Sequence, residues 1–99
     1  MPFKLRFAGE ARNVLASMEA DNTYAKKLKK VRACLGRLET DPRHASLGSH
    51  RYQSIAGPNG EEVWESYVEN RTPGAWRVWW WYGPGRGEIT VLTIGPHPD

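Results

Sequence analysis

The sequence predicts an α+β fold, in which two N-terminal helices pack on one face of a small, mostly antiparallel, curved sheet. Three observations predict it: apolar residues alternate with period 2 near the N-terminus, recur every three or four residues up to about residue 40, and then return to strand patterns between short turns. The predicted order is strand, helix, helix and four strands. Because 99 residues suffice for one core and not for two, we expect residues 1–99 to form a single domain.

The first 40 residues predict one strand and two helices. Residues 3–7 alternate apolar and basic side chains, as in a strand with one buried face. Residues 10–20 carry apolar side chains at helical spacing, and Asp21 then caps a second helix that runs from about residue 23 to residue 39. Pro42 follows its end. The apolar stripe of the second helix consists of Tyr24, Leu28, Val31, Leu35 and Leu38.

Beyond Pro42 the sequence predicts strands separated by turns. A polar loop is expected over residues 42–49. Clusters of Gly and Pro then separate runs of β-branched and aromatic residues. Short connections between successive strands indicate an antiparallel meander. The expected strands are 50–56, 62–70, 75–82 and 89–94.

Residues 75–82 carry different chemistry on their two faces. Period-2 alternation separates Trp76, Val78, Trp80 and Tyr82 from Arg77, Trp79 and Trp81. We assign Trp76 and Trp80 to the core, together with Trp64, because a small domain needs large side chains to fill its interior. An arginine between tryptophans has two explanations. Either the second face is an open cleft whose rings stack on a ligand, or Arg77 forms a buried ion pair with Glu65 or Glu69.

Composition argues against several classes of function. No run of about 18 apolar residues is present, and the N-terminus does not resemble a signal peptide. We therefore expect a cytoplasmic protein without a membrane partner. The single cysteine, Cys34, cannot form an internal disulfide or a multi-thiolate metal site, and we interpret it as a small buried hydrophobe. The three histidines lack the spacing of a metal motif, so neither a metal nor a cofactor is expected.

The charge distribution favours a polyanionic partner. The net charge is +3, all five lysines lie within the first 30 residues, and the second half of the chain uses arginine alone. The planar guanidinium suits the recognition of phosphates and base edges. Five arginines on the surface of a small domain would also be ordinary.

Several segments together resemble the RelE/ParE superfamily of bacterial toxins. They are the order of the elements, the Asp41-Pro42 pair after the second helix, the strand segment AWRVW at 75–79 and the closing VLTIGPH at 91–97. This resemblance spans nearly the whole chain. It implies the toxin of a type II toxin-antitoxin system, of the RelE/YoeB/HigB-like mRNA interferase branch, which cuts messenger RNA in the ribosomal decoding site and is inhibited by a cognate antitoxin. The matching positions place Arg77 and His97 in the RNA cleft.

Metal-independent RNA cleavage requires a base for the 2′-hydroxyl, a cation for the phosphate and an acid for the leaving 5′-oxygen. We predict Arg77 as the phosphate clamp and His97 as acid or base, since an imidazole can serve as either near neutral pH. His50 and Glu65 are the further candidates, with Glu65 acting as a base or orienting a histidine. Alternatively, His97 and His50 are solvated surface residues and the other two form a cross-strand ion pair.

A second set of residues is predicted to bind RNA. Aromatic rings beside Arg77 would stack on unpaired bases, and cationic side chains would attract phosphates. The set consists of Arg51, Arg71, Trp79, Trp81, Tyr82, Lys26 and Lys30. An exposed aromatic face could equally hold an antitoxin peptide or a second copy of the chain, and the lysines could form a solvated helix face.

The sequence is also compatible with two other functions. The absence of lysine after Lys30 excludes a cleavage mechanism that depends on lysines in the cleft. The alternatives to a ribonuclease are a non-catalytic toxin of the ParE branch, which acts on DNA gyrase, and an interaction module of the same fold that has lost activity.

Overall fold

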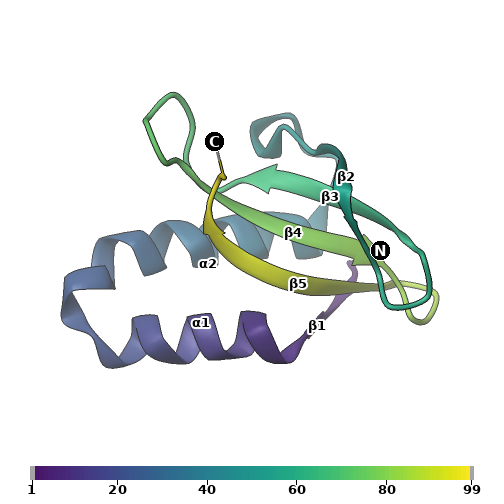
Figure 1. Ribbon diagram of the computed structural model, residues 1–99, viewed down its shortest axis with the longest axis horizontal. Helices are drawn as coiled ribbons and strands as arrows, with labels where there is room; N and C mark the ends of the chain where they lie inside the picture. The colour runs from purple at the N-terminus through teal and green to yellow at the C-terminus, as the bar shows by residue number, and fades with distance from the viewer. Residues whose placement is uncertain (1, 99) are drawn as a thin grey trace.

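The computed structural model describes residues 2–98 and places two helices on one face of a five-stranded sheet (Figure 1). The strand order is β1-β5-β4-β3-β2, with β1 parallel to β5 and the other neighbours antiparallel. The predicted α+β fold class is confirmed. The elements are β1 (Lys4–Phe7), α1 (Gly9–Ala20), η1 (Asn22–Tyr24), α2 (Ala25–Thr40), η2 (Ala45–Leu47), β2 (His50–Ala56), β3 (Glu62–Tyr67), β4 (Trp76–Tyr82) and β5 (Glu88–Pro96).

The start of the second helix differs from the prediction. The Asp21 carboxylate accepts a hydrogen bond from the Thr23 backbone N–H at 3.0 Å and caps η1, a short 3₁₀ turn that leads into α2. The Thr23 hydroxyl also donates to this carboxylate, at 2.7 Å, and these two hydrogen bonds lower the pKa of the Asp21 carboxyl. Tyr24 belongs to this turn and is 40% exposed, so its assignment to the buried stripe is wrong. The rest of the stripe is buried as expected, and Cys34 lies within it.

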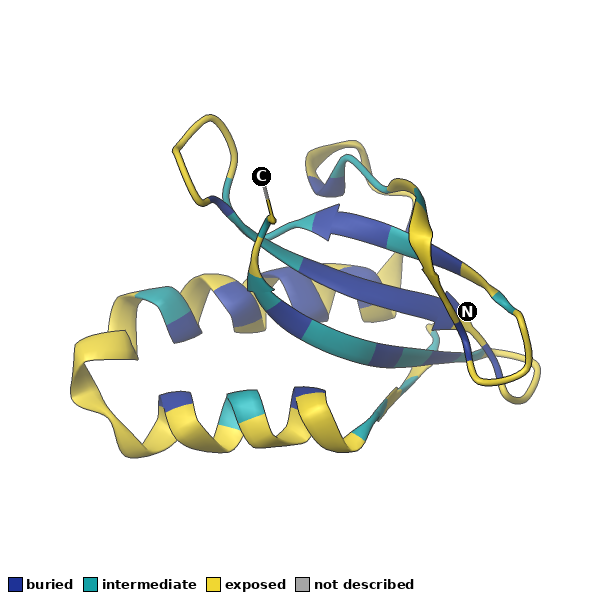
Figure 2. Cartoon of the chain, in the orientation of Figure 1, coloured by how far each residue is buried: buried dark blue, intermediate teal, exposed yellow. Residues whose placement is uncertain are grey.

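The core lies between the helices and one face of the sheet (Figure 2). Trp80 is fully buried there, and Trp64 and Trp76 pack against the core from its margin, as predicted. Burial of such large apolar surfaces is the main stabilising contribution in a small domain. The other central side chains are Val31, Leu38, Leu47, Val78, Ile89, Val91 and Ile94.

The sheet has two register shifts, one between β4 and β5 and one between β2 and β3. The β4–β5 register shifts after Trp79, which pairs with Thr93, while Trp80 pairs with Val91. The β2–β3 register also shifts, between Arg51 and Ala56. Such bulges increase local twist and curvature.

β3 is shorter than predicted, since it ends at Tyr67 instead of residue 70. The next two backbone N–H groups, of Val68 and Glu69, both donate to the Trp76 carbonyl oxygen, so the chain leaves the ladder there. None of the helices within residues 2–98 is long and apolar enough to cross a membrane.

Candidate active site

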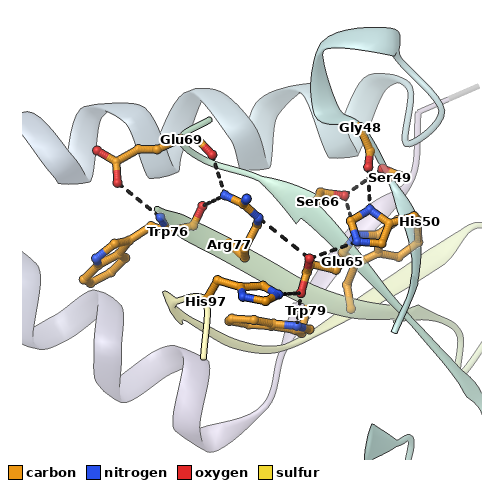
Figure 3. Close-up of polar contacts among 11 residues, drawn as sticks. Gly48, Ser49, His50, Glu65, Ser66, Glu69, Trp76, Arg77, Trp79 and His97 are labelled. Carbon is orange, nitrogen blue, oxygen red and sulfur yellow. Dashed lines mark hydrogen bonds and ion pairs between the residues drawn. The ribbon is translucent and has the colours of Figure 1, made fainter. Parts of the chain in front are cut away.

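The sheet face opposite the helices contains a buried carboxylate surrounded by nitrogen atoms (Figure 3). Glu65, on β3, is 2% exposed. Its Oε1 lies 2.9 Å from His50 Nε2 and 3.7 Å from Arg77 Nε. Its Oε2 accepts a hydrogen bond from Trp79 Nε1 at 2.9 Å and lies 3.4 Å from His97 Nε2. Two strands, β2 and β4, and the residue after β5 therefore supply partners for a single carboxylate on β3.

Strand register explains this convergence. His50 is the Cα partner of Glu65 on one side, and Trp79 is its partner on the other. Directly opposed residues of antiparallel strands project from the same face, so the three side chains are neighbours. Arg77 precedes Trp79 by two residues and shares that face. His97 is held next to them because its backbone N–H donates to the Ala75 carbonyl oxygen at 2.9 Å.

The His50 ring is held at both nitrogens. Nδ1 lies 2.8 Å from the Gly48 carbonyl oxygen, which can only accept, so Nδ1 carries a proton. Nε2 then faces the Glu65 carboxylate. The side chains of His50 and His97 are 47% and 38% exposed, so both rings extend from the buried carboxylate to solvent.

Arg77 is a cation held in a fixed position beside Glu65. Its side chain is 12% exposed, and Nη1 donates to the backbone carbonyl oxygens of Glu69 and Trp76. The guanidinium carbon lies 4.2 Å from the centre of the Tyr67 ring, a cation–π contact. The predicted ion pair of Arg77 with Glu65 is therefore present, whereas Glu69 contributes only a carbonyl oxygen.

The Glu69 carboxylate has different partners. Lys27 Nζ donates to it at 2.7 Å, and Lys30 Nζ lies 3.6 Å away. The Lys27 hydrogen bond is the main reason why the pKa of the Glu69 carboxyl is lowered. Lys30, predicted to bind RNA, is thus part of an ion-pair cluster near the start of α2.

The predicted open aromatic face is wrong. Trp79 and Trp81 are each 5% exposed and cannot stack on bases. The Tyr52 ring, on β2, packs against Trp79, and the Trp81 ring lies so close to Gly83 that a Cβ there would be 2.4 Å from it. The Trp79 ring is thus covered by the edge strand β2, and the Trp81 ring by the turn at Gly83.

Tyr82 is 42% exposed but belongs to the other face. It contacts Phe3, Trp64 and Trp80 on the side that the helices cover, away from Glu65. Burial raises the pKa of its hydroxyl. The prediction that Tyr82 stacks beside Arg77 is therefore also wrong.

The remaining predicted cations do not gather at Glu65. Arg51 shares its face with Trp64, its Cα partner, and lies 3.4 Å from Glu62. Lys26 is exposed on α2, on the opposite side of the sheet, and Arg71 is exposed in the β3–β4 loop. Their predicted contact with RNA has no support from this geometry.

Tyr52 also lies at the site, although it was not among the predicted site residues. Its ring is partly exposed and lies 5.8 Å from the Trp79 ring and 6.4 Å from the His97 ring, between centroids. Period-2 alternation from His50 would have placed Tyr52 on the Glu65 face. The weak apolar pattern of β2 obscured that signal.

A cavity of about 490 Å³ lies on the other face of the sheet, between the 42–49 loop and the aromatic rings of Trp64, Trp80 and Tyr82. Glu65 and its partners do not line this cavity. No group of three or more His, Cys, Asp or Glu within the described residues is arranged to hold a metal ion.

No protein-family model matches the sequence, and no curated protein matches it significantly. Solved structures do match along nearly their whole length. The YoeB/ParE toxin from Agrobacterium tumefaciens superimposes with a TM-score of 0.71 at 10% identity, covering 96% of this chain and 99% of that one. The chain has a RelE/ParE-type toxin fold.

Two further structures have the same RelE/ParE-type fold. The YoeB dimer from Staphylococcus aureus matches with a TM-score of 0.65 at 12% identity, over 99% of this chain and 100% of that one. The RelE–RelB complex from Pyrococcus horikoshii OT3 matches with a TM-score of 0.64 at 12% identity, over 97% and 96%. At such identities the likeness is one of fold. The catalytic roles of Arg77, His97, His50 and Glu65 stay predictions.

Proposed function

We propose that the protein is the toxin of a toxin-antitoxin pair and a metal-independent endoribonuclease that cleaves messenger RNA at the ribosome, in the cytoplasm. The carrying observation is the convergence of His50, His97 and Arg77 on the buried Glu65. The RelE/ParE-type fold supports the toxin assignment. Because one similar structure was solved as a RelE–RelB complex, we propose a cognate antitoxin as the partner.

The proposed reaction is a transesterification within the RNA. A base takes the proton of the 2′-hydroxyl, the 2′-oxygen attacks the adjacent phosphorus, and the P–O5′ bond breaks while an acid protonates the 5′-oxygen. The products are a 2′,3′-cyclic phosphate and a 5′-hydroxyl. In this proposal the partly exposed His97 serves as acid or base toward the substrate, and Glu65 orients its ring. His50, whose two ring nitrogens contact Gly48 and Glu65, holds the carboxylate in place. The fixed charge of Arg77 stabilises the additional negative charge on the phosphate.

The test is induced expression in a bacterial host, with primer extension on an abundant transcript. We expect cuts inside translated codons, and a loss of about 10²- to 10⁴-fold in cleavage for His97→Ala, the range for removal of an acid–base group. His44→Ala is the matched control, because the His44 side chain accepts from Ser46 in η2 and lies outside the site. Unchanged cleavage by His97→Ala would refute the assigned site.

One observation favours the non-catalytic alternative. Glu65 and Arg77 are both largely buried and contact each other, as they would in a purely structural network. Growth arrest with intact transcripts would support a ParE-like toxin with another target. Absence of arrest would indicate an interaction module of this fold.

A further inference from the structure

Tyr52 lies beside the histidines of the Glu65 site. It follows His50 by two residues on β2, the edge strand, and therefore projects from the same face. Its ring makes T-shaped contacts with Trp79, at an interplanar angle of 61°, and with His97, at 80°. These contacts fix the plane of the ring. Neither contact is a parallel stack on the Tyr52 ring.

Other aromatic rings near Glu65 are already covered. Trp79 and Trp81 are 5% exposed, and the Arg77 guanidinium lies over the Tyr67 ring. Tyr52 retains partial exposure and contacts His97, which is itself 38% exposed. A planar ligand that reaches His97 therefore meets the Tyr52 ring next to it.

We propose that Tyr52 forms a nucleobase-stacking subsite, which holds the base next to the phosphate that is cleaved. This inference rests on the proposed ribonuclease function. Unpaired bases of RNA are commonly bound by stacking on aromatic side chains, a mode that tolerates different bases. Stacking beside His97 would also hold the 2′-oxygen and the phosphate in line, the arrangement that raises the rate of an intramolecular attack.

The subsite predicts a modest base preference. Preferences in such sites arise from stacking strength and not from hydrogen-bond recognition of base edges. Loss of the ring should therefore change both the rate and the distribution of cut positions. Loss of the hydroxyl alone should change neither.

The experiment compares Tyr52→Leu, which keeps apolar bulk against Trp79, with Tyr52→Phe, which keeps the ring. Gln53→Ala is the control, since Gln53 is the exposed neighbour on the same strand. Cleavage of a defined messenger RNA is followed by primer extension in a cell-free translation reaction, over a range of RNA concentrations. Melting temperatures verify that each variant is folded.

We expect Tyr52→Leu to reduce cleavage roughly 5- to 150-fold, the equivalent of one stacked base, chiefly through a higher KM. Its cut positions should also shift relative to wild type. Tyr52→Phe and Gln53→Ala should cleave like wild type. The same rate and cut positions for Tyr52→Leu, or an equal loss in Tyr52→Phe, would overturn the subsite while the ribonuclease function stands.

A binding measurement separates the subsite from catalysis. A 2′-O-methylated trinucleotide cannot be cleaved, because it lacks the attacking hydroxyl. Stacking should produce ring-current shifts in the NMR signals of Tyr52 and the adjacent Trp79 indole, also in the His97→Ala variant. Absence of these shifts would overturn the subsite. Their presence in a protein that cuts no transcript would support base stacking on Tyr52 but refute the proposed ribonuclease function, and with it the place of that base next to a cleaved phosphate.

Discussion

On each face of the β3–β4 strand pair, a tryptophan indole N–H of β4 donates a hydrogen bond to a buried side chain of β3. The surroundings of the two bonds differ. On the helix-covered face, Trp80 Nε1 donates to the Ser66 hydroxyl at 2.8 Å, and Ser66 in turn bonds the Ser49 hydroxyl. On the opposite face, Trp79 Nε1 donates to Glu65 at 2.9 Å, where charged partners gather. The acceptors are equally buried, at 0% and 2% exposed. Burial alone therefore does not distinguish a structural network from a candidate site; charge and access to solvent do.

The largest effect is expected from exchanging the acceptors themselves. Glu65→Gln should cost about 3 kcal/mol in unfolding free energy, because it removes one partner of a buried ion pair, and should lower cleavage at least 10²-fold by releasing the His97 ring. Ser66→Ala should cost about 1–3 kcal/mol by leaving the Trp80 N–H without its acceptor, with cleavage per folded molecule unchanged. Urea unfolding and primer extension measure the two quantities. Equal losses of cleavage in both variants would remove the distinction between the faces.

Exchanging the donors should produce the same pattern with a smaller loss of cleavage. Trp80→Phe should cost about 1–3 kcal/mol, because it shortens a fully buried side chain, and should not alter cleavage by the folded protein. Trp79→Phe should lower cleavage about 10-fold, the equivalent of a lost hydrogen bond to the carboxylate that orients His97. Cleavage rates normalised to the folded fraction test this pair. A larger catalytic loss in Trp80→Phe would contradict the assignment.

An ion pair at the margin of the sheet should respond to pH. Since the Lys27 hydrogen bond lowers the pKa of the Glu69 carboxyl, its stabilisation is present above the ordinary carboxyl pKa and is lost as the pH falls through the lowered value. Lys27→Met should reduce the unfolding free energy by about 1 kcal/mol at pH 7, with the difference from wild type vanishing in acid. Lys26→Met, on the exposed face, should change it at neither pH. A Lys27→Met deficit that persists in acid would mean that packing on Trp76 is responsible.

The last prediction concerns the core between α2 and the sheet, where Cys34 is buried. Burial raises the pKa of the Cys34 thiol to about 12, so very little thiolate is present near pH 8. Iodoacetamide should alkylate the native protein at least about 10²-fold more slowly than the urea-unfolded protein. Mass spectrometry of timed samples measures both rates. Rapid alkylation of the folded protein would show that α2 opens readily from the sheet.

Patterning was sufficient for most of the fold. The helical spacing of Leu28, Val31, Leu35 and Leu38, and the turn residues between strands, depend on local geometry that the chain carries wherever it folds. The candidate site was predictable in its residue types, and the structure brings Arg77, His97, His50 and Glu65 together. It was not predictable that the carboxylate lies at the centre, because register across three strands decides that.

The sequence by itself determined the order of the elements, the apolar stripe of α2 and the assignment of Trp80 and Arg77 to opposite faces, since alternation along a strand is a local property. Only the tertiary structure decided how exposed each face is. Bulges curve the sheet, and β2 and the Gly83 turn cover Trp79 and Trp81, so the ring left beside His97 is that of Tyr52. Exposure depends on contacts between segments far apart in the chain, and a period of two residues carries no information about them.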